Sequence, residues 1–250
     1  MRRTILIGGL VLLAIGGLAW WASAQQTAPD GPAYSVPIFF SNELPANCRE
    51  HAVERRREFA RDSRTAYDIV FVGDSLVENW SPLPLAQSHH AANRGIGCDS
   101  TNGLHERLAR DVIAYHPRAA VVLIGVNDIY LLAWLGRADR VHRTAMNIVA
   151  IAQRLQGHGV RPLIVLPLPV RAPITGESTE LSNAMIGDLN AELTKLLPLS
   201  NADFVDASAA LGDEHHALRP EFTPDGLHLS PAGYAVLNRL VEPQLEKLMR

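Results

Sequence analysis

Short apolar runs alternate with longer amphipathic stretches along most of the chain. The strongest runs read as strands buried on both faces, and they cover 67–72, 119–124, 161–166 and 203–205. A weaker strand is expected near 91–94. Between and after the runs, apolar residues recur at helical spacing over 101–115, 137–156, 182–197 and 231–247. Strands that alternate with helices predict an α/β fold with a parallel sheet covered on both faces.

The first thirty residues have a different pattern. Two arginines follow Met1, and residues 5–21 are almost wholly apolar, as in an export signal or a membrane span. Residues 22–24, Ala-Ser-Ala, have the form of a cleavage site, whereas Trp20 and Trp21 also suit a retained anchor. We expect residues 1–24 to be a signal peptide or an N-terminal membrane anchor. The rest of the protein would then be exported: periplasmic, secreted or anchored to the membrane by this segment.

Residues 25–47 are rich in proline and have no apolar period, which indicates a linker. From 48 to 64 charges are dense, and Val53, Phe59 and Ala60 are the expected inner stripe of a solvated helix. A single catalytic domain is therefore expected over 48–250.

Composition narrows the class of protein. The 250 residues are 47% hydrophobic and 20% charged, which indicates a folded globular chain. The net charge is −3, and no basic stripe is long enough to neutralise a run of phosphates. Nucleic acid is therefore excluded as an expected partner, a membrane would be met only through the N-terminal segment, and the oligomeric state stays open.

Small and polar residues follow the predicted strands, at the edge where ligands of parallel sheets bind. These loops contain Gly-Asp-Ser-Leu at 73–76, Asn-Arg-Gly-Ile-Gly-Cys-Asp at 93–99 and Gly-Val-Asn-Asp at 125–128. A fourth block, Asp-Gly-Leu-His at 225–228, precedes the Ser-Pro pair that opens the last helix.

Acyl transfer needs the residue types that these blocks contain. A serine such as Ser75 becomes nucleophilic when a base takes its proton, and His228 can be that base while Asp225 holds its other ring nitrogen. The oxyanion of the tetrahedral intermediate needs donors, for which the backbone N–H of Ser75, a second backbone N–H and the amide of Asn127 are candidates.

The four ordered blocks resemble those of the SGNH hydrolases, also called the GDSL esterase/lipase family, from residue 67 to about residue 240. The resemblance implies a flavodoxin-like sandwich with a parallel five-stranded sheet of order 2-1-3-4-5. It also implies Ser75 as nucleophile, His228 as general base and acid, Asp225 as its orienting carboxylate and Asn127 as an oxyanion donor. No cofactor and no metal are expected.

The chain departs from this family at one oxyanion position. A glycine usually stands just before the Asp of the second block and donates its backbone N–H, whereas this chain has Cys98 there. If that position needs a positive φ, Cys98 carries strain or shifts the loop. Cys48 and Cys98 can form a disulfide in an oxidising compartment, or both can be free.

Other polar residues receive structural interpretations. Asp74 and Asp128 are expected to brace their loops rather than act as acids or bases. The histidine pairs lack a third ligand at metal spacing, so we expect surface loops at 89–90 and 215–216. The prolines at 167, 169 and 173 are expected to shape a rigid loop at the mouth of the pocket.

The sequence thus predicts an exported serine esterase that works through an acyl-enzyme. Its expected substrate is a small-molecule or glycan ester with a small acyl group, such as acetyl, on a carbohydrate or envelope glycan. A lysophospholipase or short-chain lipase and an acyltransferase are the alternatives within the family. A catalytically silent glycan-binding domain is the alternative outside enzymes.

Overall fold

The fold is built around a five-stranded parallel sheet. The computed structural model describes residues 46–131, 136–173 and 178–250. The strand order is β2-β1-β3-β4-β5, which confirms the expected order 2-1-3-4-5. The strands are β1 (Ile69–Gly73), β2 (Ala91–Gly95), β3 (Ala119–Leu123), β4 (Arg161–Val165) and β5 (Asp203–Val205).

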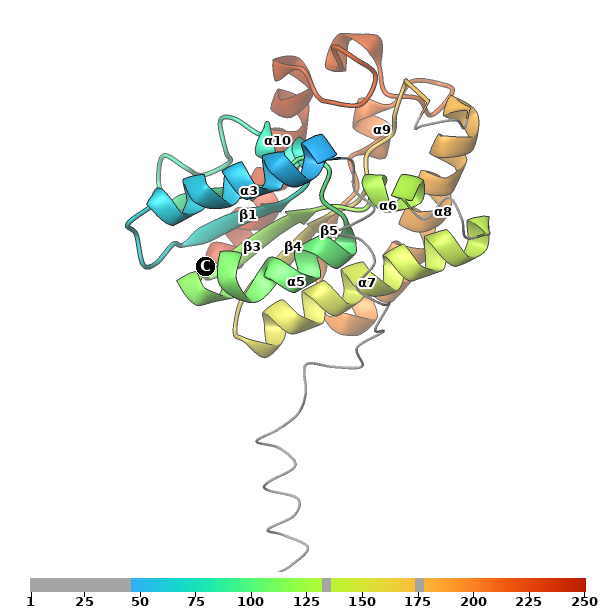
Figure 1. Ribbon diagram of the computed structural model, residues 1–250. Coiled ribbons are helices and arrows are strands. Elements are labelled where there is room, and N and C mark those ends of the chain that lie inside the picture. The colour runs from blue at the N-terminus through green and yellow to red at the C-terminus, as the bar shows by residue number, and fades with distance from the viewer. Residues whose placement is uncertain (1–45, 132–135, 174–177) are drawn as a thin grey trace, which may run out of the picture. The chain divides into compact units, whose positions relative to one another are not determined.

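Helices cover both faces of this sheet. In Figure 1 α5 and α7 lie in front of the strands and α10 lies behind them. The short α4 shares the face of α10, since Tyr234 of α10 donates its hydroxyl to the carbonyl of Leu76. The helical elements are α3 (Ala46–Arg61), α4 (Ser75–Glu78), α5 (Thr101–Asp111), η1 (Ile113–Tyr115), α6 (Val126–Leu131), α7 (Arg137–Gly157), α8 (Thr179–Leu196), η2 (Pro198–Ser200), α9 (Ser208–Leu211), η3 (Pro220–Phe222) and α10 (Pro231–Met249).

The inner strands β1 and β3 are buried along their whole length. Both are built almost entirely from apolar residues, which suits strands packed between two helical layers. Because parallel neighbours in register end together, Gly73 of β1 lies beside Gly95 of β2 and Leu123 of β3. The loops that follow these residues therefore emerge at one edge of the sheet.

Local capping sets where the helices begin and end. Helix α8 begins at Thr179, earlier than its apolar pattern predicts, because the side chain of Ser178 accepts the N–H of Leu181. The predicted helix over 101–115 divides into α5 and the 3₁₀ turn η1, with His116 in the left-handed conformation after it. Ser230 caps α10 and Pro231 begins it, as expected.

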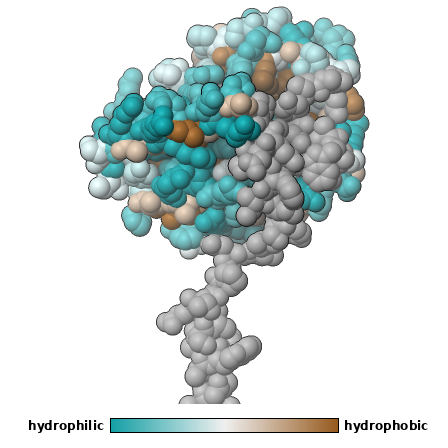
Figure 2. Space-filling view, in the orientation of Figure 1, coloured by the Kyte–Doolittle hydropathy of each residue, from teal (hydrophilic) through white to brown (hydrophobic). Residues whose placement is uncertain are grey.

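Helix α3 confirms a solvated helix but corrects its inner stripe. Phe59 is buried, whereas Val53 is 44% exposed and Ala60 is also exposed. Cys48 is the other buried residue of the helix, and Ala52 and Arg55 lie half-buried between it and Phe59. The sequence pattern did not predict this inner stripe, because Arg55 counts as a polar residue in the pattern although it is half-buried in the structure. Hydrophilic side chains dominate the described surface over α3 in Figure 2.

Several expectations fall outside the described residues. The signal peptide or anchor at 1–24 and nearly all of the linker at 25–47 lie there. Among the helices of the described ranges, none combines the length and the apolar character that a membrane crossing requires.

Candidate active site

Ser75 is the first residue of α4, directly beyond the carboxyl end of β1. The chain turns sharply here: a Cβ on Gly73 would lie 1.9 Å from the carbonyl oxygen of Leu123, so only glycine fits. Asp74 caps α4 by accepting the N–H of Leu76 at 2.9 Å. The structure thus places the Ser75 side chain, half-buried, at the sheet edge where ligands bind.

Asp225 and His228 meet Ser75 from the opposite end of the chain. Oδ2 of Asp225 lies 2.6 Å from Nδ1 of His228, and Nε2 of His228 lies 2.9 Å from Oγ of Ser75. With Nδ1–H donating to the carboxylate, Nε2 accepts the serine hydroxyl proton. The three side chains form the hydrogen-bonded chain that a nucleophilic serine needs.

The Asp225 to His228 turn is organised by its own backbone. Oδ1 of Asp225 accepts the N–H groups of Leu227 and His228 at 2.9 and 2.8 Å. Burial opposes ionisation, but the hydrogen bonds from the His228 ring and from these two N–H groups outweigh it and lower the pKa of Asp225 to about 2. Asp225 is therefore a carboxylate throughout the neutral range, although its side chain is 49% exposed.

A neighbouring loop supports this turn. The carbonyl of Gly226 accepts the N–H groups of Arg171 and Ala172. Gly226 has φ +87°, and a Cβ there would lie 2.6 Å from Ala172, so the close approach needs glycine. Asn183 of α8 bonds both the N–H and the carbonyl of Val170. The loop with the three prolines thus braces the Asp225 to His228 turn, a role that the sequence did not predict.

The expected oxyanion donors come from two other strand ends. Asn127, half-buried in α6, donates its amide to the carbonyl of Asp99 at 2.9 Å. An amide has two N–H groups, so this bond fixes the side chain and leaves one donor for a ligand. Cys98 has φ +64°, in the left-handed region that favours glycine. The condition stated for this position is therefore met, and Cys98 carries the strain of a positive φ.

The two cysteines form a disulfide, Cys48 to Cys98, across 50 residues of sequence. This resolves the alternative that the sequence left open. The bond joins the first turn of α3 to the loop after β2, so a helix lying before the catalytic motifs is covalently attached to the candidate oxyanion loop.

Sequence reasoning missed Arg107. This buried side chain donates to the carbonyls of Gly73 and Arg94 at 3.0 and 2.8 Å, and to the carboxylates of Asp99 and Asp111 at 2.7 and 3.4 Å. One guanidinium thereby joins the ends of β1 and β2 to the oxyanion loop. Its signal in the sequence is an arginine between Leu104 and Leu108, on the apolar face of α5.

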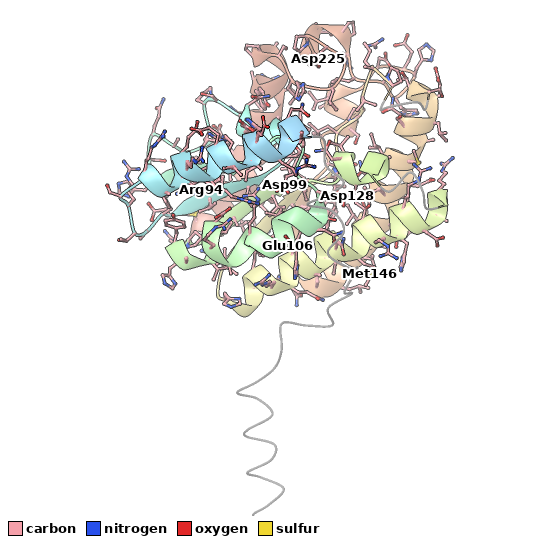
Figure 3. The ribbon with its side chains drawn as sticks, viewed as in Figure 1. Arg94, Asp99, Glu106, Asp128, Met146 and Asp225 are labelled. Carbon is pink, nitrogen blue, oxygen red and sulfur yellow. A yellow bond between two sulfur atoms is a disulfide. The ribbon has the colours of Figure 1, made fainter. Side chains whose placement is uncertain are left out.

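Three buried carboxyl groups lie behind the site: Asp74, Asp99 and Asp128. Figure 3 shows Asp99 and Asp128 near the centre, between α3, α5 and α6, and Asp225 on a separate loop. Burial raises the pKa of Asp74 to about 8 and that of Asp128 to about 7, with the neighbouring Asp99 adding to both. Asp128 accepts the N–H and the hydroxyl of Thr101, and Asp74 caps α4. These contacts confirm that both residues brace their loops.

The two histidine pairs lie in loops and belong to none of the hydrogen bonds described for this site. His215 and His216 are exposed in a turn after α9, His90 is exposed and His89 is half-buried. In the part of the chain that the structure describes, no group of three or more His, Cys, Asp or Glu side chains could hold a metal ion.

Comparisons with known proteins show the family and the fold. A model of the GDSL-like lipase/acylhydrolase family matches residues 62–236. The chain is 25% identical to a candidate acylhydrolase from Bacteroides fragilis, with a TM-score of 0.66 over 78% of this chain and 95% of that one. It is 17% identical to an acetylxylan esterase from Geobacillus stearothermophilus, with a TM-score of 0.56 over 74% and 95% of the two chains. The second likeness shows the fold alone.

A curated relative is the N-acylneuraminate cytidylyltransferase of Escherichia coli O18:K1:H7, which is 26% identical over 202 residues. The aligned region covers 80% of this chain but 45% of the cytidylyltransferase. The chain thus spans less than half the length of this relative.

Proposed function

The chain belongs to the GDSL-like lipase/acylhydrolase family, and from this premise we propose that it is an exported esterase that removes small acyl groups from carbohydrate or envelope glycan. The observation that supports esterase activity is the hydrogen-bonded chain from Asp225 through His228 to Ser75. In the proposed roles Ser75 is the nucleophile, His228 the general base and acid, and Asp225 the carboxylate that orients the ring.

The first half of the reaction acylates the enzyme. Oγ of Ser75 attacks the ester carbonyl while Nε2 of His228 takes its proton, and the negative Asp225 stabilises the imidazolium. The N–H groups of Ser75 and Cys98 and the free amide hydrogen of Asn127 donate to the oxyanion. The bond from the carbonyl carbon to the alcohol oxygen then breaks, and the alcohol leaves with the proton that His228 holds.

The second half restores the enzyme. His228 deprotonates a water molecule, which attacks the acyl-enzyme, and the carboxylic acid leaves as Oγ of Ser75 regains the proton. Atoms and charge balance with water as the only co-substrate. The side chains named here supply every proton transfer.

The small acyl group and the glycan are supported by a less direct argument. An export segment followed by a linker would bring the domain to the cell envelope, where glycans are abundant. Two proteins similar to this chain have names that refer to carbohydrates, acetylxylan and N-acylneuraminate. Our proposal takes the substrate class from these two facts and takes no cytidylyltransferase activity from the relative.

The test is a substrate panel together with covalent labelling. The purified protein should hydrolyse p-nitrophenyl acetate and acetylated sugars faster than long-chain esters, and a fluorophosphonate should modify Ser75. Ser75→Ala should lose labelling and about 10⁴-fold or more in kcat. Ser88→Ala, at an exposed serine, is the matched control and should keep both.

Distinct results would contradict distinct parts of the proposal. A kcat/KM that rises steadily toward long acyl chains would replace the glycan esterase with a lipase. An adduct mapped to another serine would overturn the assignment of Ser75. Binding of acetylated sugar without turnover or labelling would favour a silent binding domain.

A further inference from the structure

Helix α3 precedes the region that matches the family, which begins at residue 62, yet it is attached to the candidate oxyanion loop. Arg55 donates from Nη2 to the carbonyl of Gly95 at 3.2 Å. His51 of α3 and the N–H of Gly97 share Oε2 of Glu78, at 2.8 and 2.6 Å. The third attachment is the disulfide to Cys98. Residues 95, 97 and 98 are thus each held, directly or through Glu78, by one side of this helix.

The disulfide is attached to the loop at Cys98, whose backbone conformation is unfavourable for a residue other than glycine. Cys98 has φ +64°, which places its Cβ close to the carbonyl oxygen that follows it. On either side the N–H groups of Gly97 and Asp99 are already used, by Glu78 and by the carbonyl of Ile96. Within the described residues no acceptor is found for the N–H of Cys98. The backbone conformation of Cys98 therefore decides the direction in which its free N–H donor points.

The same loop also positions Asn127. The carbonyl of Asp99, the residue after Cys98, accepts the Asn127 amide, and the Asp99 carboxylate is bonded to buried Arg107. A change of backbone conformation at Cys98 would shift the Asp99 peptide and with it the second donor. The loop is fixed at Asp99 by Arg107, and at Cys98 by the disulfide.

We propose that Cys48 is a positioning residue, which through its disulfide holds Cys98 in the left-handed conformation and so aims the oxyanion donors. In this chain the cross-link from α3 thereby holds a backbone conformation that a glycine would adopt without a cross-link, because glycine has no Cβ. The inference rests on the proposed esterase function, because its readout is the rate of acyl transfer.

A matched pair of variants separates this role from a general loss of stability. Cys48→Ser removes the cross-link and leaves a non-glycine residue at 98. The double variant Cys48→Ser/Cys98→Gly also lacks the cross-link, but its residue 98 adopts a positive φ at no steric cost. Both variants should therefore melt at a similarly lowered temperature, while their rates differ.

We expect Cys48→Ser to lose about 5- to 30-fold in kcat, the size of a left-handed residue's conformational penalty, with little change in KM. The double variant should recover most of that loss. Its rate of fluorophosphonate labelling at Ser75 should recover in parallel, because phosphonylation uses the same oxyanion donors. If Cys48→Ser does not fold by circular dichroism, wild-type protein that has folded in the oxidised form is reduced with dithiothreitol and assayed while its circular dichroism is still native, against the oxidised protein.

Two results would overturn the positioning role. One is a Cys48→Ser variant with the wild-type kcat, and the other is a double variant no faster than Cys48→Ser. A wild-type protein that neither hydrolyses esters nor reacts with the fluorophosphonate would instead overturn the proposed function, and the positioning role with it.

Discussion

The two halves of the candidate site are built in different ways. The Asp225 to His228 turn is local in sequence and exposed: its carboxylate bonds two N–H groups and a ring that lie within three residues. The oxyanion half has half-buried donors on a buried support, and its contacts join α3, β1, β2, α5 and α6. Arg107 alone links Gly73, Arg94 and Asp99.

Because of this difference, substitutions in one half should change mainly the catalytic rate, whereas substitutions in the other half should change the stability of the fold as well. A change in the exposed turn removes a catalytic group but few buried contacts, so the fold should survive it. A change in the buried half leaves polar groups without partners in a low dielectric, so it should cost stability as well. Variants in each half can therefore test whether the two are as independent as their contacts indicate.

The largest effect is expected for Asp225→Asn. The amide can hold the His228 ring in the wrong tautomer, and kcat should fall about 10⁴-fold. Because Asp225 is half-exposed, solvent screens most of the stability that its charge contributes, and the melting temperature at neutral pH should fall only slightly. Steady-state kinetics and thermal melts check both statements. A large fall in melting temperature would mean that this turn is structural after all.

Arg107→Met should show the opposite behaviour. It leaves two buried carbonyls and the Asp99 carboxylate without their cationic donor, and unfolding should become easier by about 3–5 kcal/mol. Urea denaturation measures this change. Glu106→Ala, at an exposed position on the same helix, is the control and should stay within about 0.5 kcal/mol of wild type. Equal effects of the two variants would contradict the role given to Arg107.

Asn127→Ala tests whether the half-buried amide acts in the reaction. Loss of one oxyanion donor should lower kcat about 10²- to 10³-fold with little change in KM. Asn147→Ala offers a control, because Asn147 is a half-buried amide that donates to Thr101 and Asn102 instead. A similar loss of kcat in both variants would show that packing, rather than the donor, is responsible.

The smallest effect concerns pH, where the two halves should respond in opposite directions. Asp74 keeps its proton up to about pH 8 in the fold but ionises near pH 4 when unfolded. The unfolded chain thus releases this proton first, and the stability that the neutral carboxyl contributes is lost as pH rises from about 4 through 8. Asp225, with its pKa near 2, contributes stability above about pH 4 that is lost as pH falls toward 2.

Melting temperatures across pH check this statement. Asp74→Asn keeps an acceptor for Leu76 and cannot ionise, so its melting temperature should fall less than that of the wild type between pH 5 and 8. The difference should be about 2–4 °C for each kcal/mol involved. Asp225→Asn should leave the slope over this range unchanged. A wild-type slope in Asp74→Asn would mean that the Asp74 carboxyl is already ionised in the fold.

Much of this protein could be predicted from local patterns. The strong apolar runs placed β1, β3, β4 and β5, and for β1 and β3 the reason is that a strand buried on both faces has to be apolar along its length. The strand β2 was expected only as a weaker one, because it contains Asn93 and Arg94. The pairing of Asp225 with His228 could be predicted from the sequence because both residues lie in one turn. The inner stripe of α3 and the loop that braces Gly226 could not be predicted, because their burial depends on contacts with distant segments.

The sequence by itself determined the α/β class, the strand-end motifs and the candidates Ser75, Asn127, Asp225 and His228, since each depends on residue types at short spacing. Only the tertiary structure decided that Cys48 and Cys98 are bonded, that Arg107 joins three segments and that Asp74 and Asp128 share a buried cluster. The physical reason is that pairing, desolvation and burial are properties of groups brought together from distant positions, and residue spacing along one chain does not encode which of them meet.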